Sequence, residues 1–283
     1  MMGTAVVDGI ETRFTVTGTG PPLLLFSPGG FNATLDNWST HGIYRRIGLL
    51  PRLAERYTCI AFDRREAGAS GGRVERVSWE SYTRQAVGLL DHLAVDRAHL
   101  VGGCVGCSSA AALAVARPDR VASLVLYSPA GGPAYRMRQH ARFTRHLAFV
   151  EEHGLGAVVD LAASTTATFS DDGRVGPWVT VIRRDAAFAD AYRKTDPAGY
   201  AVLVTGMARL MFDRDTVPGA EPEDLMLLDV PALVVPGQDS SHATSAARYL
   251  AECLPRSSYW DVAVAAQTAD TAPARVLEFL ASV

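Results

Sequence analysis

Short runs of consecutive apolar residues alternate with helical patterns at both ends of this chain. The runs expected to form strands are residues 11–17, 23–26, 58–62, 99–102, 232–235 and 257–262. The helical patterns cover residues 78–94, 242–254 and 272–281, and Ser78 is expected to cap the first of them. Strands that are apolar on both faces are typical of a parallel sheet covered by helices on both sides. The pattern therefore predicts an α/β fold with a mostly parallel, doubly wound sheet.

The middle of the chain follows a different pattern. From about Gly131 to Asp229 it is rich in Arg, Ala, His and aromatic residues, has helical periodicity and contains no clear strand. We interpret residues 132–229 as a helical cap inserted before the penultimate strand, and residues 1–131 and 230–283 as the core. An independent helical domain is the alternative, but no flexible linker brackets the segment.

Composition excludes several classes of protein. Lys and Arg number 27 against 30 Asp and Glu, and this balance lacks the basic excess of a nucleic-acid binder. No apolar run approaches the ~18 residues that span a bilayer. Four cysteines are too few for a disulfide scaffold of this length, and no His or Cys cluster suggests a metal site. We expect a cytoplasmic protein without metal or cofactor that contacts neither nucleic acid nor membrane, and self-association into a homodimer stays open.

The most informative segment is residues 98–117, AHLVGGCVGCSSAAALAVAR. An expected strand runs into Gly102-Gly103-Cys104-Val105-Gly106, and an Ala-rich helix follows. This is the strand–turn–helix context of a nucleophile elbow, here as G-x-C-x-G. The two outer glycines leave room for the close crossing of strand and helix. Backbone N–H groups and the helix dipole at this position favour an anion, so the thiolate form of Cys104 should be stabilised.

With this motif the chain resembles the α/β-hydrolases that carry a helical cap, and the likeness covers nearly its whole length. Four further segments match in order: residues 24–31 (LLFSPGGF), 63–70 (DRREAGAS), 122–132 (ASLVLYSPAGG) and 231–239 (PALVVPGQD). The second has Glu66 where the family usually has Gly. The resemblance implies hydrolysis of a small-molecule acyl substrate.

The resemblance also implies roles for individual residues. The oxyanion hole would use the backbone N–H of Val105 and one from the Gly30–Phe31 loop. Asp239 would be the catalytic acid, with Asp261 and Asp270 as substitutes. We predict that apolar cap residues line an acyl pocket, or else form the core of the cap; those assigned to substrate binding are Phe143, Trp178 and Met207.

Two departures from the family pattern bear on the chemistry. The nucleophile position holds Cys instead of Ser, as in dienelactone hydrolases and polyhydroxyalkanoate synthases. The loop after the last strand, residues 260–270, has no His, although the family places its general base there. His242 lies three residues after Asp239, and strand ends converge on one crevice in such sheets. We therefore predict a Cys104–His242–Asp239 triad, the alternative being that His242 only caps a helix.

The other histidines receive structural interpretations. We expect His92 and His99 to flank a surface turn. His140, His146 and His153 fall on the first cap helix, where we expect solvent exposure, the alternative being that one of them faces the pocket.

The function that follows is cleavage of an ester, thioester or lactone through a Cys104 acyl-enzyme. Without a base for water, the same fold would support an acyltransferase, a non-hydrolytic lyase or cyclase, or a ligand-binding pseudoenzyme. Cys104-x-x-Cys107 also matches a redox pair. We favour the elbow, because both glycines are then explained and Cys107 becomes a small core residue.

Overall fold

A computed structural model describes residues 1–213 and 216–283. Eight strands form one sheet in the order β1-β2-β4-β3-β5-β6-β7-β8. Their bounds are β1 (Met2–Val7), β2 (Ile10–Thr17), β3 (Pro22–Phe26), β4 (Thr58–Phe62), β5 (Ala98–Gly103), β6 (Val121–Tyr127), β7 (Ala232–Val235) and β8 (Ser257–Tyr259). The pairs β1–β2 and β2–β4 are antiparallel and the remaining pairs are parallel. The predicted mostly parallel sheet is confirmed.

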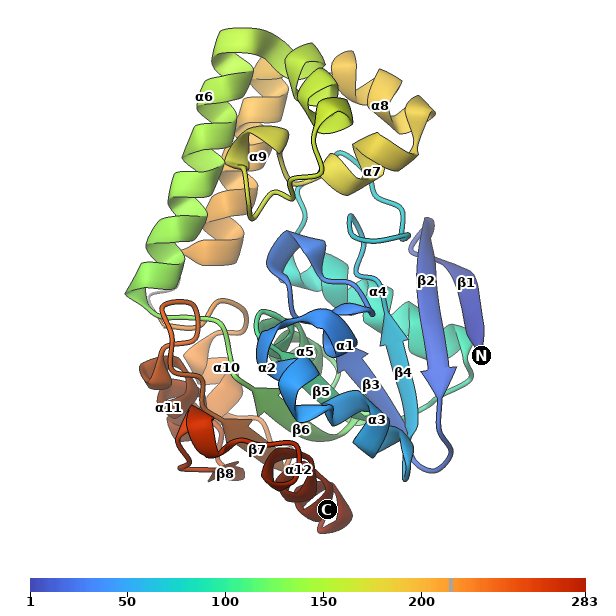
Figure 1. The fold of residues 1–283 in the computed structure, drawn as a ribbon, viewed down its shortest axis with the longest axis vertical. Coiled ribbons are helices and arrows are strands. Elements are labelled where there is room, and N and C mark those ends of the chain that lie inside the picture. Colours follow the sequence, from blue (N-terminus) through green and yellow to red (C-terminus); the bar gives the residue numbers. More distant parts are fainter. Residues whose placement is uncertain (214–215) are drawn as a thin grey trace.

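Helices cover both faces of this sheet (Figure 1). One face packs against α4 (Trp79–His92), α5 (Gly106–Ala116), α10 (Pro222–Met226) and α11 (Thr244–Cys253). The other face packs against α1 (Asn37–Thr40), α2 (Gly42–Ile47), α3 (Leu49–Ala54) and α12 (Thr271–Ala281). The continuous apolar strands follow from this layering, because both of their faces are buried.

The remaining helices lie beyond one end of the sheet (Figure 1). They are α6 (Pro133–Ser164), α7 (Val179–Arg184), α8 (Ala186–Arg193) and α9 (Pro197–Phe212), called the cap helices below. All four lie between β6 and the penultimate strand β7, as predicted. A backbone break at Gly154, with φ 75° and ψ 170°, interrupts α6. The cap helices share an aromatic-rich core, which Phe31 and Val105 from the sheet domain join.

Local sequence signals account for the element ends. Ser78 caps α4 as predicted: its side chain accepts from the Ser81 N–H, and Ser81 in turn contacts the Ser78 backbone. The predicted strand 257–262 is shorter, ending at Tyr259. The edge strand β1 and the short helices α1 to α3 were not predicted, because none of these four elements has a long periodic pattern of apolar residues. In the part of the chain described, no helix is both long and apolar enough to cross a membrane.

Candidate active site

Cys104 stands on a strained turn between β5 and α5. Its φ of 55° lies in the left-handed region, which residues other than glycine seldom adopt. Hydrogen bonds hold it there: its N–H donates to the Tyr127 carbonyl at 3.3 Å, and its carbonyl accepts from Cys107 and Ala130 at 3.1 and 3.2 Å. The half-buried side chain borders a cavity. A strained backbone that its surroundings maintain is a frequent property of reactive positions.

The glycines beside Cys104 are required by the close crossing of β5, α5 and β3. A Cβ on Gly102 would lie 2.6 Å from the Cys107 Cα, and one on Gly106 would lie 2.1 Å from the Phe26 carbonyl oxygen. Both distances are far below van der Waals contact, so a side chain would force the elements apart. The G-x-C-x-G spacing thus has a steric cause in this fold.

Asp239 and His242 lie together in the loop after β7. Nδ1 of His242 is 2.9 Å from each Asp239 carboxylate oxygen. The carboxylate also accepts the backbone N–H groups of Ser241 and His242, at 2.7 and 3.0 Å. A Cβ on Gly237 would lie 2.4 Å from the His242 Cβ, so this glycine lets the two segments meet. Because a carboxylate only accepts, Nδ1 carries the donated proton and Nε2 is the nitrogen free for chemistry.

The electrostatics couple His242 to Cys104. Nε2 is buried, and among the described residues none meets it in full hydrogen-bond geometry. Burial opposes the charged ring, but hydrogen-bonding and charge interactions with Cys104 and Asp239 outweigh it and raise the pKa of His242 to about 9. Burial also opposes ionisation of Asp239, but the hydrogen bond from His242 leaves the pKa of that carboxyl below its usual value. The three predicted triad residues are therefore in one place, with imidazolium the favoured form of His242 at neutral pH.

The 28–32 loop forms the neighbouring edge of the cavity. Gly29 and Gly30 have φ of 119° and 62° and lead into a single 3-10 turn, Gly30–Asn32. Arg64 holds this loop: its Nη2 donates to the Gly30 carbonyl at 2.5 Å. Its guanidinium carbon lies 4.1 Å from the Tyr82 ring centroid and 5.6 Å from that of Phe31.

A second side chain, from α1, fastens the same loop. The Asn37 Nδ2 donates to the carbonyls of Pro28 and Asn32, both at 2.7 Å. Gly30 and Cys104, the residues next to the two predicted oxyanion donors Phe31 and Val105, line the cavity. The Phe31 ring itself is buried in the cap core.

The cavity beside Cys104 measures about 360 Å³, and most of the residues that line it have polar side chains. It is lined by Gly29, Gly30, Asn32, Asn37, His41, Cys104, Tyr135, Arg138, Gln139, Arg142, Thr168, Ser170, Asp171, Ser241 and His242. Sequence reasoning missed most of these residues. The signal that could have found the α6 wall is the run Tyr135, Arg138, Gln139, Arg142, whose spacing places polar residues on one helix face.

The three residues predicted to bind substrate lie elsewhere. Phe143, Trp178 and Met207 are at most 2% exposed, pack in the cap core and are not among the residues lining the cavity. The prediction of an apolar acyl pocket walled by these side chains thus differs from the structure. Large apolar residues at helical spacing serve a helix–helix core and a pocket wall equally well, and here the helices close on one another.

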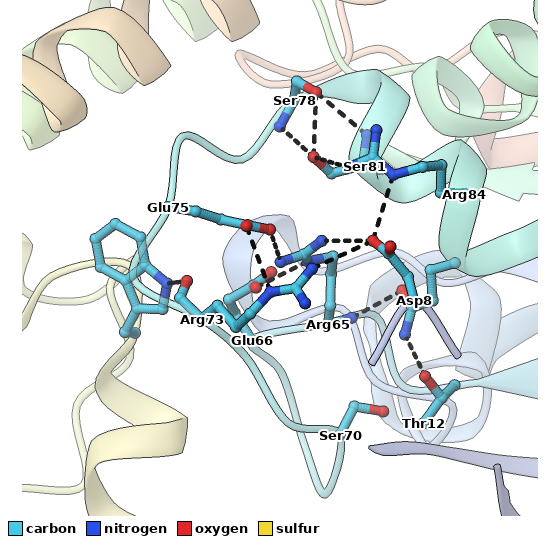
Figure 2. A network of polar contacts seen from close by, with 12 residues as sticks. Asp8, Thr12, Arg65, Glu66, Ser70, Arg73, Glu75, Ser78, Ser81 and Arg84 are labelled. Carbon is cyan, nitrogen blue, oxygen red and sulfur yellow. Dashed lines mark hydrogen bonds and ion pairs between the residues drawn. The ribbon is translucent and has the colours of Figure 1, made fainter. Parts of the chain in front are cut away.

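Glu66 belongs to a buried ionic network and not to the cavity (Figure 2). Its Oε1 accepts from the Arg65 Nε at 2.9 Å, and Arg65 also contacts Glu75 and Asp8. Both members of the Glu66–Arg65 pair are at most 2% exposed, and burial raises the pKa of Glu66 to about 6. Arg73 and Arg84 join through Asp8. The network ties the N-terminal hairpin to the 64–75 segment, and Glu66 serves in it as the partner of Arg65.

His146 is placed differently from the prediction, whereas His99 flanks the turn between α4 and β5 as expected. His146 is fully buried in the cap, with Nε2 2.6 Å from the Tyr200 hydroxyl and Nδ1 3.1 Å from the Arg174 carbonyl. His99 is 9% exposed, with Nδ1 2.8 Å from the Ser123 hydroxyl. The position of His146 on the cap helix suggested solvent exposure, but both rings are buried and have hydrogen-bond partners. Neither lines the cavity.

The second cysteine of the C-x-x-C pair is a core residue, as favoured above. Cys107 is fully buried in α5, and its thiol donates to the Gly102 carbonyl at 3.2 Å. All four cysteines are free thiols. Among the residues that the model describes, no three His, Cys, Asp or Glu side chains gather as a metal site needs. Asp261 and Asp270 are exposed and do not border the cavity.

Comparison with known proteins supports the same architecture. The family model of the alpha/beta hydrolase fold matches residues 22–159. The 2-hydroxymuconate semialdehyde hydrolase of Pseudomonas sp. (strain CF600) is 35% identical over 132 residues, 44% of this chain and 42% of that protein. A dihydrolipoyllysine-residue acetyltransferase component of the acetoin cleaving system from Cupriavidus necator is 35% identical over 127 residues, 45% of this chain and 32% of that one. The matches thus span less than half the length of these relatives.

Solved structures extend the likeness to the whole chain. The enol-lactonase from Burkholderia xenovorans LB400 superposes with a TM-score of 0.63 at 23% identity, covering 99% of this chain and 100% of that one. An esterase from Thermogutta terrifontis gives a TM-score of 0.62 at 21% identity, covering 100% and 98%. The chain has the α/β-hydrolase fold. Several of the proteins that it resembles are hydrolases by name.

Proposed function

We propose that this protein is a hydrolase that cleaves an ester, thioester or lactone of a small molecule through an acyl-enzyme on Cys104. The observation that carries the proposal is the Asp239–His242 pair beside Cys104 at one edge of a cavity. A nucleophile, a base within reach of it and a carboxylate that orients the base are the parts that nucleophilic acyl transfer requires.

In the first half-reaction the Cys104 thiolate attacks the substrate carbonyl carbon. The carbonyl oxygen becomes an oxyanion, for which the N–H groups of Phe31 and Val105 are the proposed donors. The tetrahedral adduct then collapses, the bond to the leaving group breaks, and His242 transfers the Nε2 proton to it. The products are a thioester on Cys104 and a neutral imidazole.

The second half-reaction follows from the origin of the raised His242 pKa. Part of that rise comes from Cys104, and acylation removes the charge from its sulfur. The pKa of His242 then falls, so the imidazole stays neutral and can take a proton from water as the water attacks the thioester. The acid leaves, the thiolate returns, and the proton remains on His242. Asp239 keeps Nδ1 protonated throughout.

A displaced base therefore suffices for hydrolysis. The 260–270 loop, where the family usually has its His, contains no His in this chain. This absence is the reason for the pseudoenzyme alternative. The Asp239–His242 geometry weighs against that alternative, and the hydrolases among the relatives and structural neighbours agree with the proposal.

The test is acylation with p-nitrophenyl acetate followed by intact-protein and peptide mass spectrometry. Wild type should release p-nitrophenol in a burst and carry one acetyl group on Cys104, and Cys104→Ala should do neither. Cys253→Ala is the matched control, since Cys253 lies in α11 and does not border the cavity. An acetyl group that persists in Cys104→Ala contradicts the proposal. Added alcohol or thiol that receives the acyl group in place of water would identify an acyltransferase.

A further inference from the structure

The wall of the cavity formed by α6 is polar and cationic. Tyr135, Arg138, Gln139 and Arg142 follow one another at the spacing of a single helix face, and all four line the cavity that contains Cys104. The next residue of the helix, Phe143, points into the cap core instead. A helix lying over a sheet normally turns its apolar face inward, so packing does not explain this choice of residues.

Neither cavity arginine has a carboxylate partner among the residues described. Arg142 donates to the Gln139 side chain at 2.6 Å and to the Ser170 carbonyl at 3.2 Å. Arg138 donates to the Ser240 carbonyl at 2.6 Å and the Ser241 hydroxyl at 2.8 Å. These neutral acceptors orient the two guanidinium groups without cancelling their charge.

One carboxylate at the cavity offsets part of this positive charge. Asp171 is the carboxylate among the lining residues, and its Oδ2 accepts the N–H and hydroxyl of Thr168, both at 2.8 Å. Burial lowers the pKa of Arg142 and the nearby charge of Arg138 adds to this, while the charges of Tyr135 and Asp171 oppose it in part. Arg142 is half-buried and Arg138 is exposed, and two cations held close together attract an anion. By contrast, the buried Arg65 is paired with Glu66, Glu75 and Asp8.

We infer that the α6 wall selects substrates whose acyl portion ends in a carboxylate. The inference rests on the proposed function, since it assigns the far end of the same cavity. Guanidinium groups match the geometry of a carboxylate, and each has five N–H donors, more than the contacts above use.

The position along the helix indicates where the carboxylate would lie. Tyr135 is close enough to Cys104 for the thiol charge to raise the pKa of its hydroxyl beyond what burial does. Arg142 follows seven residues later, about 10 Å along the helix axis. The carboxylate therefore belongs several bonds from the reacting carbonyl, as in a half-ester of a dicarboxylic acid.

The experiment compares two activated esters of similar size, mono-p-nitrophenyl glutarate and p-nitrophenyl pentanoate. We expect wild type to prefer the glutarate half-ester in kcat/KM. Arg142→Met should lower the ratio of the two kcat/KM values by about 10- to 100-fold, which is the usual worth of a hydrogen-bonded charge. Arg145→Met is the matched control: it lies on the same helix, faces solvent and does not line the cavity, so its ratio should equal that of wild type.

Each other outcome has a defined meaning. A ratio in Arg142→Met within twofold of wild type, or no preference in wild type, overturns the inference while Cys104 acylation still stands. If neither ester acylates Cys104, the proposed function fails. Calorimetry of Cys104→Ala with glutarate then tests whether the cavity binds a carboxylate at all. Binding that Arg142→Met abolishes would support an anion site independent of catalysis, and absence of binding would overturn it.

Discussion

Replacing His242 by Gln tests the catalytic arrangement most directly. Gln has a similar reach but neither titrates nor shuttles a proton, so the substitution removes the chemistry of Nε2 with little change in volume. The rise in the His242 pKa from 6.5 to about 9 corresponds to about 3 kcal/mol in favour of the imidazolium. The interactions of His242 with Cys104 and Asp239 exceed the opposing cost of burial by this amount, and His242→Gln removes both interactions.

Two rates should therefore change in His242→Gln, by different amounts. Alkylation of Cys104 by iodoacetamide at pH 7 should slow by about 10- to 100-fold, because the thiolate loses its cation. Steady-state turnover should fall by about 100- to 10,000-fold, the usual contribution of a general acid and base. Since the thioester then lacks a base to activate water, the acyl-enzyme should accumulate, visible as a lasting mass increase on Cys104.

The pH dependence gives the sign of the effect. Wild type keeps His242 protonated up to about pH 9, so its alkylation rate at neutral pH should exceed that of His242→Gln. The two rates should converge above about pH 9, where His242 loses its charge. Turnover in His242→Gln within threefold of wild type, with equal alkylation rates at pH 7, would refute the assignment of His242. Cys104 acylation could still be correct in that case.

Three further substitutions test the frame around the site. Gly106→Ala should lower the free energy of unfolding by about 1–3 kcal/mol in thermal melts, because its Cβ would lie 2.1 Å from a β3 carbonyl oxygen. Gly156→Ala is the control and should cost nothing, because its nearest contact would lie at 3.6 Å. Burial lowers the pKa of His146 to about 4, so as the pH falls the unfolded chain binds this proton before the folded chain does. The free energy of unfolding should therefore drop by about 3 kcal/mol between pH 6.5 and pH 4. Urea titrations of His146→Gln should lack this loss, and those of the exposed His153→Gln should retain it. Arg64→Met should lower kcat by about tenfold with KM nearly unchanged, because the substitution loosens the 28–32 loop. Arg64→Lys should recover part of the lost kcat. A change confined to KM would contradict a positioning role for Arg64.

Much of the fold could be predicted because strands that are buried on both faces of the sheet consist of consecutive apolar residues, a pattern that is easily recognised in the sequence. Strands β4 and β7 match their apolar runs, 58–62 and 232–235, residue for residue. The edge strand β1 left no such record, since its side chains are buried only on alternate positions near its end. The short helices α1 to α3 each have at most six residues, too few for periodicity to stand out.

The candidate site was predictable where chemistry depends on local spacing. The turn at Cys104 and the Asp239–His242 pair each involve only a few consecutive residues, so the local sequence is enough to predict their geometry. The cavity wall was not predictable, because it depends on which face of α6 meets the sheet domain. His146 illustrates the same limit: helical spacing alone does not say that its ring lies against Tyr200 in the cap core.

The displaced histidine is consistent with how the sheet edge is built. In the 260–270 loop the buried polar side chain is Gln267, and it is fully committed: it accepts from the Tyr127 hydroxyl and donates to the Pro236 carbonyl, both at 2.8 Å. That loop therefore serves to close the sheet. The loop after β7 is one strand nearer to β5 in the order β5-β6-β7-β8, about 5 Å closer to Cys104. A base on this nearer loop needs only a short turn to reach the sulfur, and its carboxylate partner comes from the same turn. The proposed acid and the proposed base are then positioned by one local structure, so a change that moves this turn should disable both together.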